Sequence, residues 1–307
     1  MVFPGQGSQS VGMLQAYAGF AVTADVRRTV ADVLGADFLR LLDEGPAEAL
    51  GLTVNTQPAM VSAGYAAYRA WRAAGGPEPE VVAGHSLGEY TALVAAAALE
   101  FRDCLPLVRY RAQSMQEAVP EGQGAMAAIL NLEDDLVRAA CAEAAQGEVV
   151  EAVNFNAPGQ VVIAGHKAAV ARAMESCKAK GAKRTLPLPV SAPFHSSLMR
   201  PAAERLRGYL ADVAVAVPKL QLINNVDVGI ETQPAAIKDA LVRQAAAPVR
   251  WVETIRRMRQ LGVTHVVECG PGKALAGMVK RIDADLQSYA LADKASLEQA
   301  LAAIRGA

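Results

Sequence analysis

The stretch VVAGHSLGEY, residues 81–90, decides the fold of this chain. Its apolar start, 81–83, predicts a short buried strand, and the Ala-rich run TALVAAAAL, 91–99, predicts a helix behind it. Between them, Gly84, Ser86 and Gly88 form a G-x-S-x-G turn, which is typical of a nucleophile elbow. Such a turn leaves the serine hydroxyl at a helix N-terminus, where backbone N–H groups stabilise an oxyanion. Ser86 is therefore the candidate nucleophile for an acyl group.

The composition describes a globular protein without a global charge. Of 307 residues, 52% are hydrophobic and 20% are charged, and 30 basic and 31 acidic residues leave a formal net charge of -1. This balance creates no field that would draw nucleic acid or a membrane surface. No apolar run approaches the roughly 20 residues of a membrane span. We therefore expect neither nucleic acid nor a membrane as a partner.

The cysteines and the N-terminus bear on the compartment. Cys104, Cys141, Cys177 and Cys269 are scattered without C-x-x-C spacing, which favours unpaired thiols over a disulfide framework or a zinc site. The N-terminus has neither the basic start nor the long apolar core of a signal peptide. We therefore expect a cytoplasmic protein with no metal site.

The middle of the chain predicts a small separate domain. Strands are expected at 125–130, 149–155, 160–164 and 184–190, and helices at 132–145 and 167–180. The resulting order, βαββαβ, is the ferredoxin-like motif. We expect this small domain to cover 122–192 and to form a wall over the elbow, with a ligand cleft between the two domains.

The remainder predicts an α/β domain around the elbow. Strands such as 220–224 and 263–268 alternate with helices, which implies a mostly parallel sheet with helices on both faces. We expect 1–121 and 193–307 to form this α/β-hydrolase-like catalytic domain. The long helix at 55–74 carries Met60, Tyr65, Tyr68 and Trp71 at a spacing that predicts one buried face.

A serine nucleophile needs a base, most often histidine. Of the four histidines, His85 adjoins the nucleophile and more plausibly shapes the pocket, while His166 and His265 lie in positions expected to be structural. His195 lies in a Pro-containing loop at the junction of the predicted domains, so elimination favours it as the base. No Asp or Glu stands out by position as the acceptor for its second ring nitrogen, and a backbone carbonyl could serve instead.

Six motifs, in order along nearly the whole chain, together resemble the bacterial malonyl-CoA:acyl-carrier-protein transacylase family. They are 5–9 (GQGSQ), 84–90 (GHSLGEY), 115–120 (MQEAVP), 154–160 (NFNAPGQ), 224–226 (NNV) and 270–272 (GPG). The resemblance implies a role for each matching residue: Ser86 as the acyl-accepting nucleophile, His195 as its base, Gln244 as the backbone carbonyl that orients the histidine, and Gln6 with the N–H of Leu87 as the oxyanion hole.

The resemblance also implies the substrate contacts. Arg111 is expected to bind the free carboxylate of the malonyl unit, and a planar, permanently charged, bidentate guanidinium suits that task on chemical grounds. Phe194, beside the base, is expected to limit space at the malonyl α-carbon. His85 and Met115 complete the expected substrate-binding set.

The implied reaction moves a malonyl group from malonyl-CoA to the phosphopantetheine thiol of acyl carrier protein, for fatty acid biosynthesis. It needs no metal or redox cofactor, and we expect a monomer. Two alternatives stay open: a related transacylase that charges another carrier protein, in malonate decarboxylase or polyketide synthesis, and a serine thioesterase. The α/β-hydrolase order of Ser, then Asp or Glu, then a His near the C-terminus argues against the thioesterase, because His195 lies mid-chain.

Overall fold

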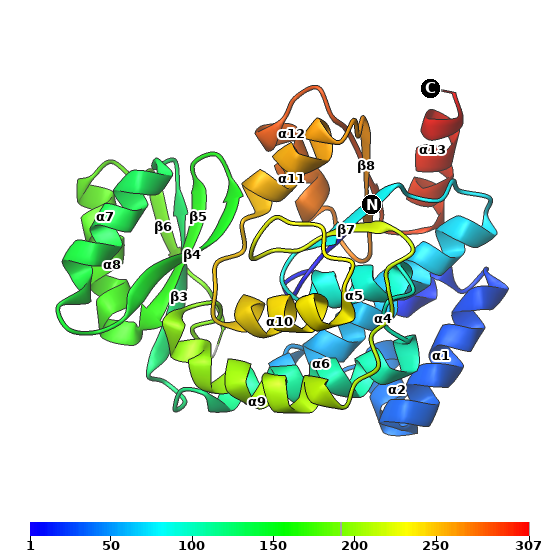
Figure 1. The fold of residues 1–307 in the computed structure, drawn as a ribbon, viewed down its shortest axis with the longest axis horizontal. Coiled ribbons are helices and arrows are strands. Elements are labelled where there is room, and N and C mark those ends of the chain that lie inside the picture. Colours follow the sequence, from blue (N-terminus) through cyan, green and yellow to red (C-terminus); the bar gives the residue numbers. More distant parts are fainter. Residues whose placement is uncertain (191, 307) are drawn as a thin grey trace.

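The structure is a computed structural model that describes residues 1–190 and 192–306. It contains a five-stranded parallel sheet and a four-stranded antiparallel sheet. Figure 1 shows the four-stranded sheet with two helices at one end of the molecule and the remaining elements gathered at the other. This mixed α/β architecture confirms the predicted fold class.

The parallel sheet has the strand order β7-β2-β1-β8-β9. These strands are β1 (Val2–Phe3), β2 (Val81–Gly84), β7 (Gln221–Ile223), β8 (His265–Cys269) and β9 (Gln287–Leu291). Both faces are covered, so β1 and β2 consist entirely of buried residues. The elbow follows β2, next to the centre of the sheet.

Helices cover both faces of the parallel sheet (Figure 1). Phe3 and Val82 pack into the larger core with helices from both halves of the chain, whereas Val2 and Val81 lie in a second cluster with Trp251 and Leu275. The helices outside the antiparallel unit are η1 (Met13–Tyr17), α1 (Ala21–Leu34), α2 (Ala36–Glu44), α3 (Ala47–Leu50), α4 (Thr53–Ala73), α5 (Gly88–Ala95), α6 (Phe101–Glu117), η2 (Ser197–Met199), α9 (Arg200–Ala211), α10 (Pro234–Ala245), α11 (Trp251–Gln260), α12 (Ala274–Ile282) and α13 (Lys294–Arg305).

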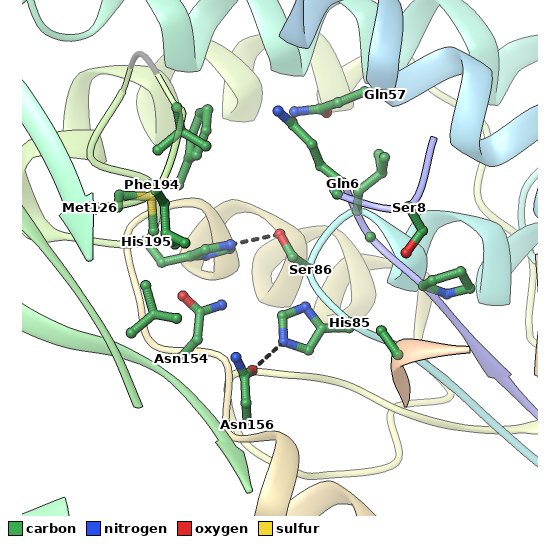
Figure 2. Close-up of a pocket in the computed structure, with 18 of the residues that line it drawn as sticks. Gln6, Ser8, Gln57, His85, Ser86, Met126, Asn154, Asn156, Phe194 and His195 are labelled. Atoms are coloured by element: carbon green, nitrogen blue, oxygen red, sulfur yellow. Dashed lines mark hydrogen bonds between the residues drawn. The ribbon is translucent and has the colours of Figure 1, made fainter. Parts of the chain in front are cut away.

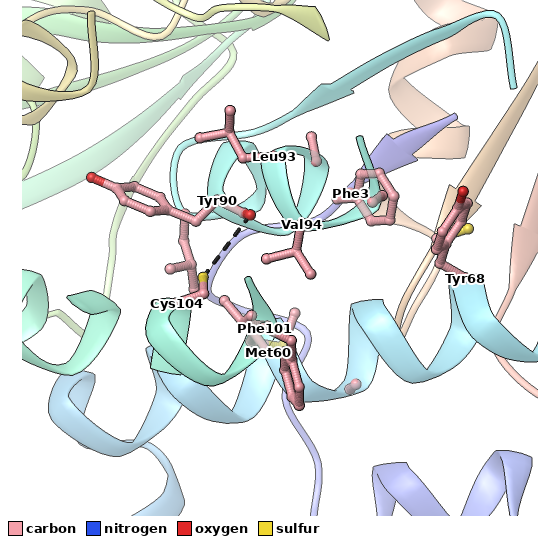
Figure 3. Close-up of a cluster of buried hydrophobic side chains, with 14 of the residues drawn as sticks. Phe3, Met60, Tyr68, Tyr90, Leu93, Val94, Phe101 and Cys104 are labelled. Carbon is pink, nitrogen blue, oxygen red and sulfur yellow. Dashed lines mark hydrogen bonds between the residues drawn. The ribbon is translucent and has the colours of Figure 1, made fainter. Parts of the chain in front are cut away.

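The larger core packs α4 and α6 against the elbow helix α5. Figure 3 shows Met60 of α4 and Phe101 of α6 next to Val94 of α5. Met60, Tyr68 and Trp71 are buried, as the helical spacing predicted, whereas Tyr65 is only half-buried and packs against the same core. The elbow therefore rests on a rigid apolar base rather than on a surface loop.

The antiparallel unit has the predicted βαββαβ order. It comprises β3 (Gly124–Leu130), α7 (Asp134–Ala145), β4 (Val150–Ala157), β5 (Gln160–His166), α8 (Lys167–Ala179) and β6 (Arg184–Pro187), with the sheet order β4-β5-β3-β6. Both helices pack on one face, where Ile129 and Ile163 are buried. Met126 and Val162 lie on the opposite face, which is turned toward the elbow.

Several predicted boundaries were wrong. The elbow helix runs from Gly88 to Ala95 instead of 91–99. It begins early because the N–H groups of Gly88 and Glu89 already donate to the carbonyl oxygens of His85 and Ser86. It ends early because Ala97 takes a left-handed φ of 54°. The strand expected over 184–190 stops at Pro187. The expected junction loop includes residue 191, and the expected catalytic domain ends at 307; both residues lie outside the described part of the chain.

The last strand and helix, β9 and α13, were not predicted. β9 pairs in parallel with β8 over its full length, and α13 begins with a capping box in which Asp293 accepts from Ser296 N and Ser296 Oγ accepts from Asp293 N. In residues 1–190 and 192–306, no helix is long and apolar enough to cross a membrane.

Candidate active site

The elbow at Ser86 requires glycine on both sides. A Cβ on Gly84 would lie 1.8 Å from the carbonyl carbon of Gly88, and one on Gly88 would lie 2.0 Å from the carbonyl oxygen of Phe3. Ser86 itself has a φ of 51°, a strained conformation for a residue with a side chain. The glycines therefore let β2, the turn and α5 approach so closely that the hydroxyl is left at the start of the helix.

The hydroxyl of Ser86 is hydrogen-bonded to the ring of His195. Ser86 Oγ lies 2.6 Å from His195 Nε2 (Figure 2). His195 Nδ1 lies 2.9 Å from the carbonyl oxygen of Gln244. A carbonyl oxygen can only accept a hydrogen bond, so Nδ1 carries the proton and Nε2 is the acceptor for the serine hydroxyl. This is the arrangement of a nucleophile and an oriented base, with a backbone carbonyl in place of a carboxylate.

His195 is held neutral. The residue is 4% exposed, and burial together with the neighbouring charge of Arg111 lowers its pKa to about 3. A neutral imidazole can take the serine proton at any pH near neutrality.

Arg111 is a buried cation beside the nucleophile. It is 2% exposed, and it donates from Nη1 to Gln57 Oε1 at 2.9 Å and from Nη2 to Gln244 Oε1 at 2.9 Å. The same Nη2 lies 3.2 Å from Ser86 Oγ, while Nε has no hydrogen-bond partner among the described residues. All three hydrogen-bond partners are neutral, so no carboxylate binds the guanidinium directly and it can take an anionic ligand.

Two groups at the elbow can donate to an oxyanion. Four backbone N–H groups of the elbow donate to protein acceptors: those of Ser86, Gly88, Glu89 and Tyr90. The Leu87 N–H, at the start of α5, has no such acceptor among the described residues. Gln6 lies in the loop after β1, with its Nε2 3.4 Å from Thr53 Oγ1. Figure 2 shows Gln6 across the hollow from His195. Both groups line the same cavity as Ser86.

The cavity lies between the parallel sheet and the antiparallel unit. It measures about 640 Å³, within the range of cofactor and small-molecule sites. Met126, Asn154 and Val162 reach it from the antiparallel unit, and Leu275 and Met278 reach it from α12. The cavity therefore gives access to Ser86 from between the two units.

The other expected substrate contacts also line this cavity. Met115 is buried in α6, and Phe194 packs beside the base in the loop that bears it. His85 lies next to Ser86, but its ring points to the antiparallel unit, with Nε2 2.7 Å from Asn156 Oδ1 (Figure 2). The structure thus brings all nine candidate residues into or around one site.

The site is also supported by residues that sequence reasoning did not assign, and by the side chain of Gln244, for which only the backbone carbonyl was expected. Gln57 and Gln244 hold the Arg111 guanidinium with their side chains, and Asn225 Oδ1 accepts from Ser86 N at 2.7 Å. Glu89 is buried behind the elbow. Glu89 and Asn225 lie within the quoted motifs 84–90 and 224–226, so the sequence did mark them. Their hydrogen-bond partners are far away in the sequence, and no local pattern identifies them.

The chain belongs to the acyl transferase family. The family model described as "Acyl transferase domain" matches residues 1–300. The chain is 52% identical over 301 residues to the malonyl CoA-acyl carrier protein transacylase of Escherichia coli strain K12, which covers 98% of this chain and 97% of that protein. The resemblance read from the motifs is confirmed at the level of the family.

Solved structures show the same relationship. The acyl-carrier-protein S-malonyltransferase of Burkholderia pseudomallei 1710b is 63% identical, with a TM-score of 0.96 over 98% of each chain. A malonyl-transacylase solved in complex with a type II PKS acyl-carrier protein is 49% identical, with a TM-score of 0.96 over 99% of this chain and 98% of that one.

Proposed function

We propose that this protein transfers a malonyl group from malonyl-CoA to the phosphopantetheine thiol of acyl carrier protein and so supplies fatty acid biosynthesis. One observation carries the proposal: Ser86 Oγ lies within hydrogen-bond reach of both His195 Nε2 and the Arg111 guanidinium. In a malonyl group the free carboxylate is only two carbon–carbon bonds from the acyl carbon. A cation this close to the nucleophile therefore favours a short diacid over a neutral acyl chain or a longer diacid.

The first half-reaction loads the enzyme. His195 Nε2 takes the proton of Ser86 Oγ as the oxygen attacks the thioester carbonyl of malonyl-CoA, and the Leu87 N–H and Gln6 stabilise the tetrahedral oxyanion. The intermediate collapses, the carbon–sulfur bond breaks, and CoA leaves as a thiol with the proton from His195. The product is a malonyl ester of Ser86.

The second half-reaction moves the malonyl group from Ser86 to the carrier protein. His195 takes the proton of the carrier thiol, whose sulfur attacks the ester carbonyl, and the same donors stabilise the second oxyanion. When the carbon–oxygen bond to Ser86 breaks, His195 returns the proton to the serine. Proton transfers and acyl transfers balance within the chain's own side chains, so the proposal includes no metal and no redox cofactor.

The wider properties are proposals too. We propose that 1–121 with 193–307 form the catalytic domain and 122–192 the small domain, and that the protein acts as a cytoplasmic monomer. The four cysteines are unpaired and buried, as expected for a reducing compartment. The relatives named for malonyl transfer to acyl carrier protein support that partner.

A second candidate function is the charging of a polyketide carrier protein. It is favoured by one observation, the high similarity to a malonyl-transacylase solved with a type II PKS carrier protein. Both candidates share the malonyl-serine intermediate and differ only in the protein that receives the acyl group.

Intact-mass analysis tests the proposal. After brief incubation with malonyl-CoA we expect a malonyl adduct on the wild type and none on Ser86→Ala, with a far weaker adduct from acetyl-CoA. Added holo acyl carrier protein of the fatty acid pathway should discharge it; preferential discharge by a polyketide carrier would select the second candidate. Steady release of CoA into water without an adduct would instead indicate a thioesterase.

A further inference from the structure

Glu89 is a buried carboxyl group that the mechanism above does not use. It is the second residue of α5, it is 2% exposed, and it lies three residues after the nucleophile. Its Oε2 accepts two hydrogen bonds, from Asn225 N at 3.0 Å and from Gln244 Nε2 at 2.9 Å. One oxygen atom thus joins the elbow helix to two segments far away in the sequence.

The first link fixes the side chain of Gln244. Its Nε2 donates to Glu89 Oε2 and to the carbonyl oxygen of Ser86 at 3.0 Å. Because both partners are acceptors, the amide nitrogen must face them, and Oε1 is then directed at Arg111 Nη2. The backbone carbonyl of the same residue accepts from His195. Gln244 therefore contacts the nucleophile, the base and the buried cation.

The second link fixes the elbow. With its backbone N–H held by Glu89, Asn225 accepts from Ser86 N through Oδ1 at 2.7 Å and donates from Nδ2 to the carbonyl oxygen of Gly84 at 2.6 Å. These bonds satisfy backbone groups on both sides of the strained turn. Ser86, His195 and Arg111 are thus each connected to the Glu89 carboxyl through one intervening residue, either Gln244 or Asn225.

We propose that Glu89 is the positioning residue of the site: by accepting from Gln244 and Asn225 it sets the direction of the Arg111 guanidinium and so the preference for malonyl over uncharged acyl groups. This inference rests on the proposed function. It assigns Glu89 no contact with the substrate. Its effect reaches the substrate only through Gln244 and Arg111.

The role depends on hydrogen-bond acceptance rather than on charge. Burial raises the pKa of Glu89 to about 7, opposed by its two hydrogen bonds and by Arg111, while Asp227 raises it further. Near neutral pH the group therefore exists partly as the acid. A glutamine offers one oxygen of the same reach, so it can accept from both Asn225 N and Gln244 Nε2, whereas an apolar side chain of similar volume cannot.

The experiment compares Glu89→Met with Glu89→Gln. Each is assayed for kcat and KM with malonyl-CoA and acetyl-CoA. Glu89→Met removes the acceptor of the Asn225 N–H and of one of the two Gln244 Nε2–H groups. We therefore expect the malonyl-over-acetyl ratio of kcat/KM to fall about 10- to 100-fold, mostly through the malonyl KM. Glu89→Gln should stay within about threefold of the wild-type ratio. The matched control is Glu268→Met, which removes another buried carboxyl, bonded to Ala276 N at 2.8 Å, and should leave the ratio unchanged.

The second part of the experiment tests whether Glu89 acts through Gln244. Gln244→Met breaks the same link while keeping the backbone carbonyl for His195, so it should lower the ratio by a similar factor, and the double variant should be no worse than either single one. This arm also decides the matter if Glu89→Met does not fold. An unchanged ratio in either Met variant, an additive double variant, or failure of Glu89→Gln to restore the ratio would overturn the proposal. A wild type that forms no malonyl adduct on Ser86 would instead overturn the proposed function.

Discussion

His195 Nδ1 lies 2.9 Å from the carbonyl oxygen of Gln244, and this single contact decides what the histidine can do. A carboxylate at that position would stabilise the protonated ring by its full charge, whereas a carbonyl offers only a dipole. Burial and the charge of Arg111 lower the pKa of the imidazole, and the hydrogen bond to the Gln244 carbonyl offsets this only in part. The base is fixed in direction without being made strongly basic.

The low pKa of His195 predicts a dependence of stability on pH. The pKa is about 3 in the folded protein and about 6.5 in the unfolded chain. Between these values only the unfolded chain binds the proton, so the contribution of the neutral histidine is complete above pH 6.5 and is lost as the pH falls toward 3. Asparagine does not titrate in this range, so His195→Asn should not lose stability in this way. Asparagine also tolerates the φ of 65° at this position.

We therefore expect the free energy of unfolding of the wild type to fall more steeply than that of His195→Asn from pH 6.5 to 4.5, by up to about 1.4 kcal/mol per pH unit. Urea denaturation at four pH values measures the difference, and the carboxylates common to both proteins cancel. Parallel curves would mean that His195 is solvated in the folded protein.

Arg111→Lys keeps a positive charge but loses the planar fork that binds Gln57 and Gln244 together. We expect kcat/KM for malonyl-CoA to fall about 100- to 1000-fold, because charge-assisted hydrogen bonds to the substrate carboxylate are lost at about 1.5 to 3 kcal/mol each. Transfer from acetyl-CoA should change little.

Arg109→Lys is the control for Arg111→Lys. Arg109 lies in the same helix, with its guanidinium 5.4 Å from the ring centroid of Phe38, and it does not line the cavity. Equal losses with malonyl-CoA and acetyl-CoA in Arg111→Lys would show that the arginine supports the fold of the elbow rather than the selection of the substrate.

Gly84→Ala tests the close approach at the elbow. Its Cβ would lie 1.8 Å from the carbonyl carbon of Gly88 and 2.2 Å from Glu89 N, and these backbone atoms cannot rotate away as a flexible side chain could. We expect a loss of more than about 4 kcal/mol of stability or no folded protein. Gly277→Ala, in the open middle of α12 with nothing within 4 Å of the added atom, should instead gain about 0.5 to 1 kcal/mol. Thermal denaturation of both proteins makes the comparison.

Phe194→Ala tests the space beside the base. The ring lines the cavity next to His195, and its removal should admit a methyl branch at the malonyl α-carbon. One methyl group is worth about 1 to 3 kcal/mol in a pocket, so we expect kcat/KM for methylmalonyl-CoA relative to malonyl-CoA to rise about 10- to 200-fold. Leu198→Ala, which packs in the same cluster away from the cavity, is the control and should leave the ratio unchanged.

Local pattern predicted most of this fold because its elements carry strong signals. The apolar run before Ser86 became β2, and the alternation of strands and helices between 122 and 190 became the ferredoxin-like unit. The chain after 283 gave no such signal. β9 is half-buried and short, so its alternation is weak, and pairing with β8 is what makes it a strand.

The candidate site was predictable where chemistry demands a residue type. A serine on a glycine-flanked turn and a histidine in a junction loop are both exceptional. Glu89 is different: a glutamate in the first turn of a helix usually faces solvent and complements the helix dipole. Only when Gln244 and Asn225 arrive from the C-terminal half does it become a buried acceptor, and no local pattern contains that information.

The antiparallel unit is joined to the rest by backbone hydrogen bonds as well as by its two chain connections. Val249 N donates to the carbonyl oxygen of Val153, and Phe155 N donates to the carbonyl oxygen of Val249, so β4 pairs with the loop that follows Gln244. β4, which forms part of the cleft, is thus hydrogen-bonded to the segment that follows Gln244, whose carbonyl accepts the hydrogen bond from His195. A chimaera that exchanges the small unit between relatives must therefore carry residues 247–250 along with it. If it does not, a graft meant to change which acyl group fits will also misalign the histidine.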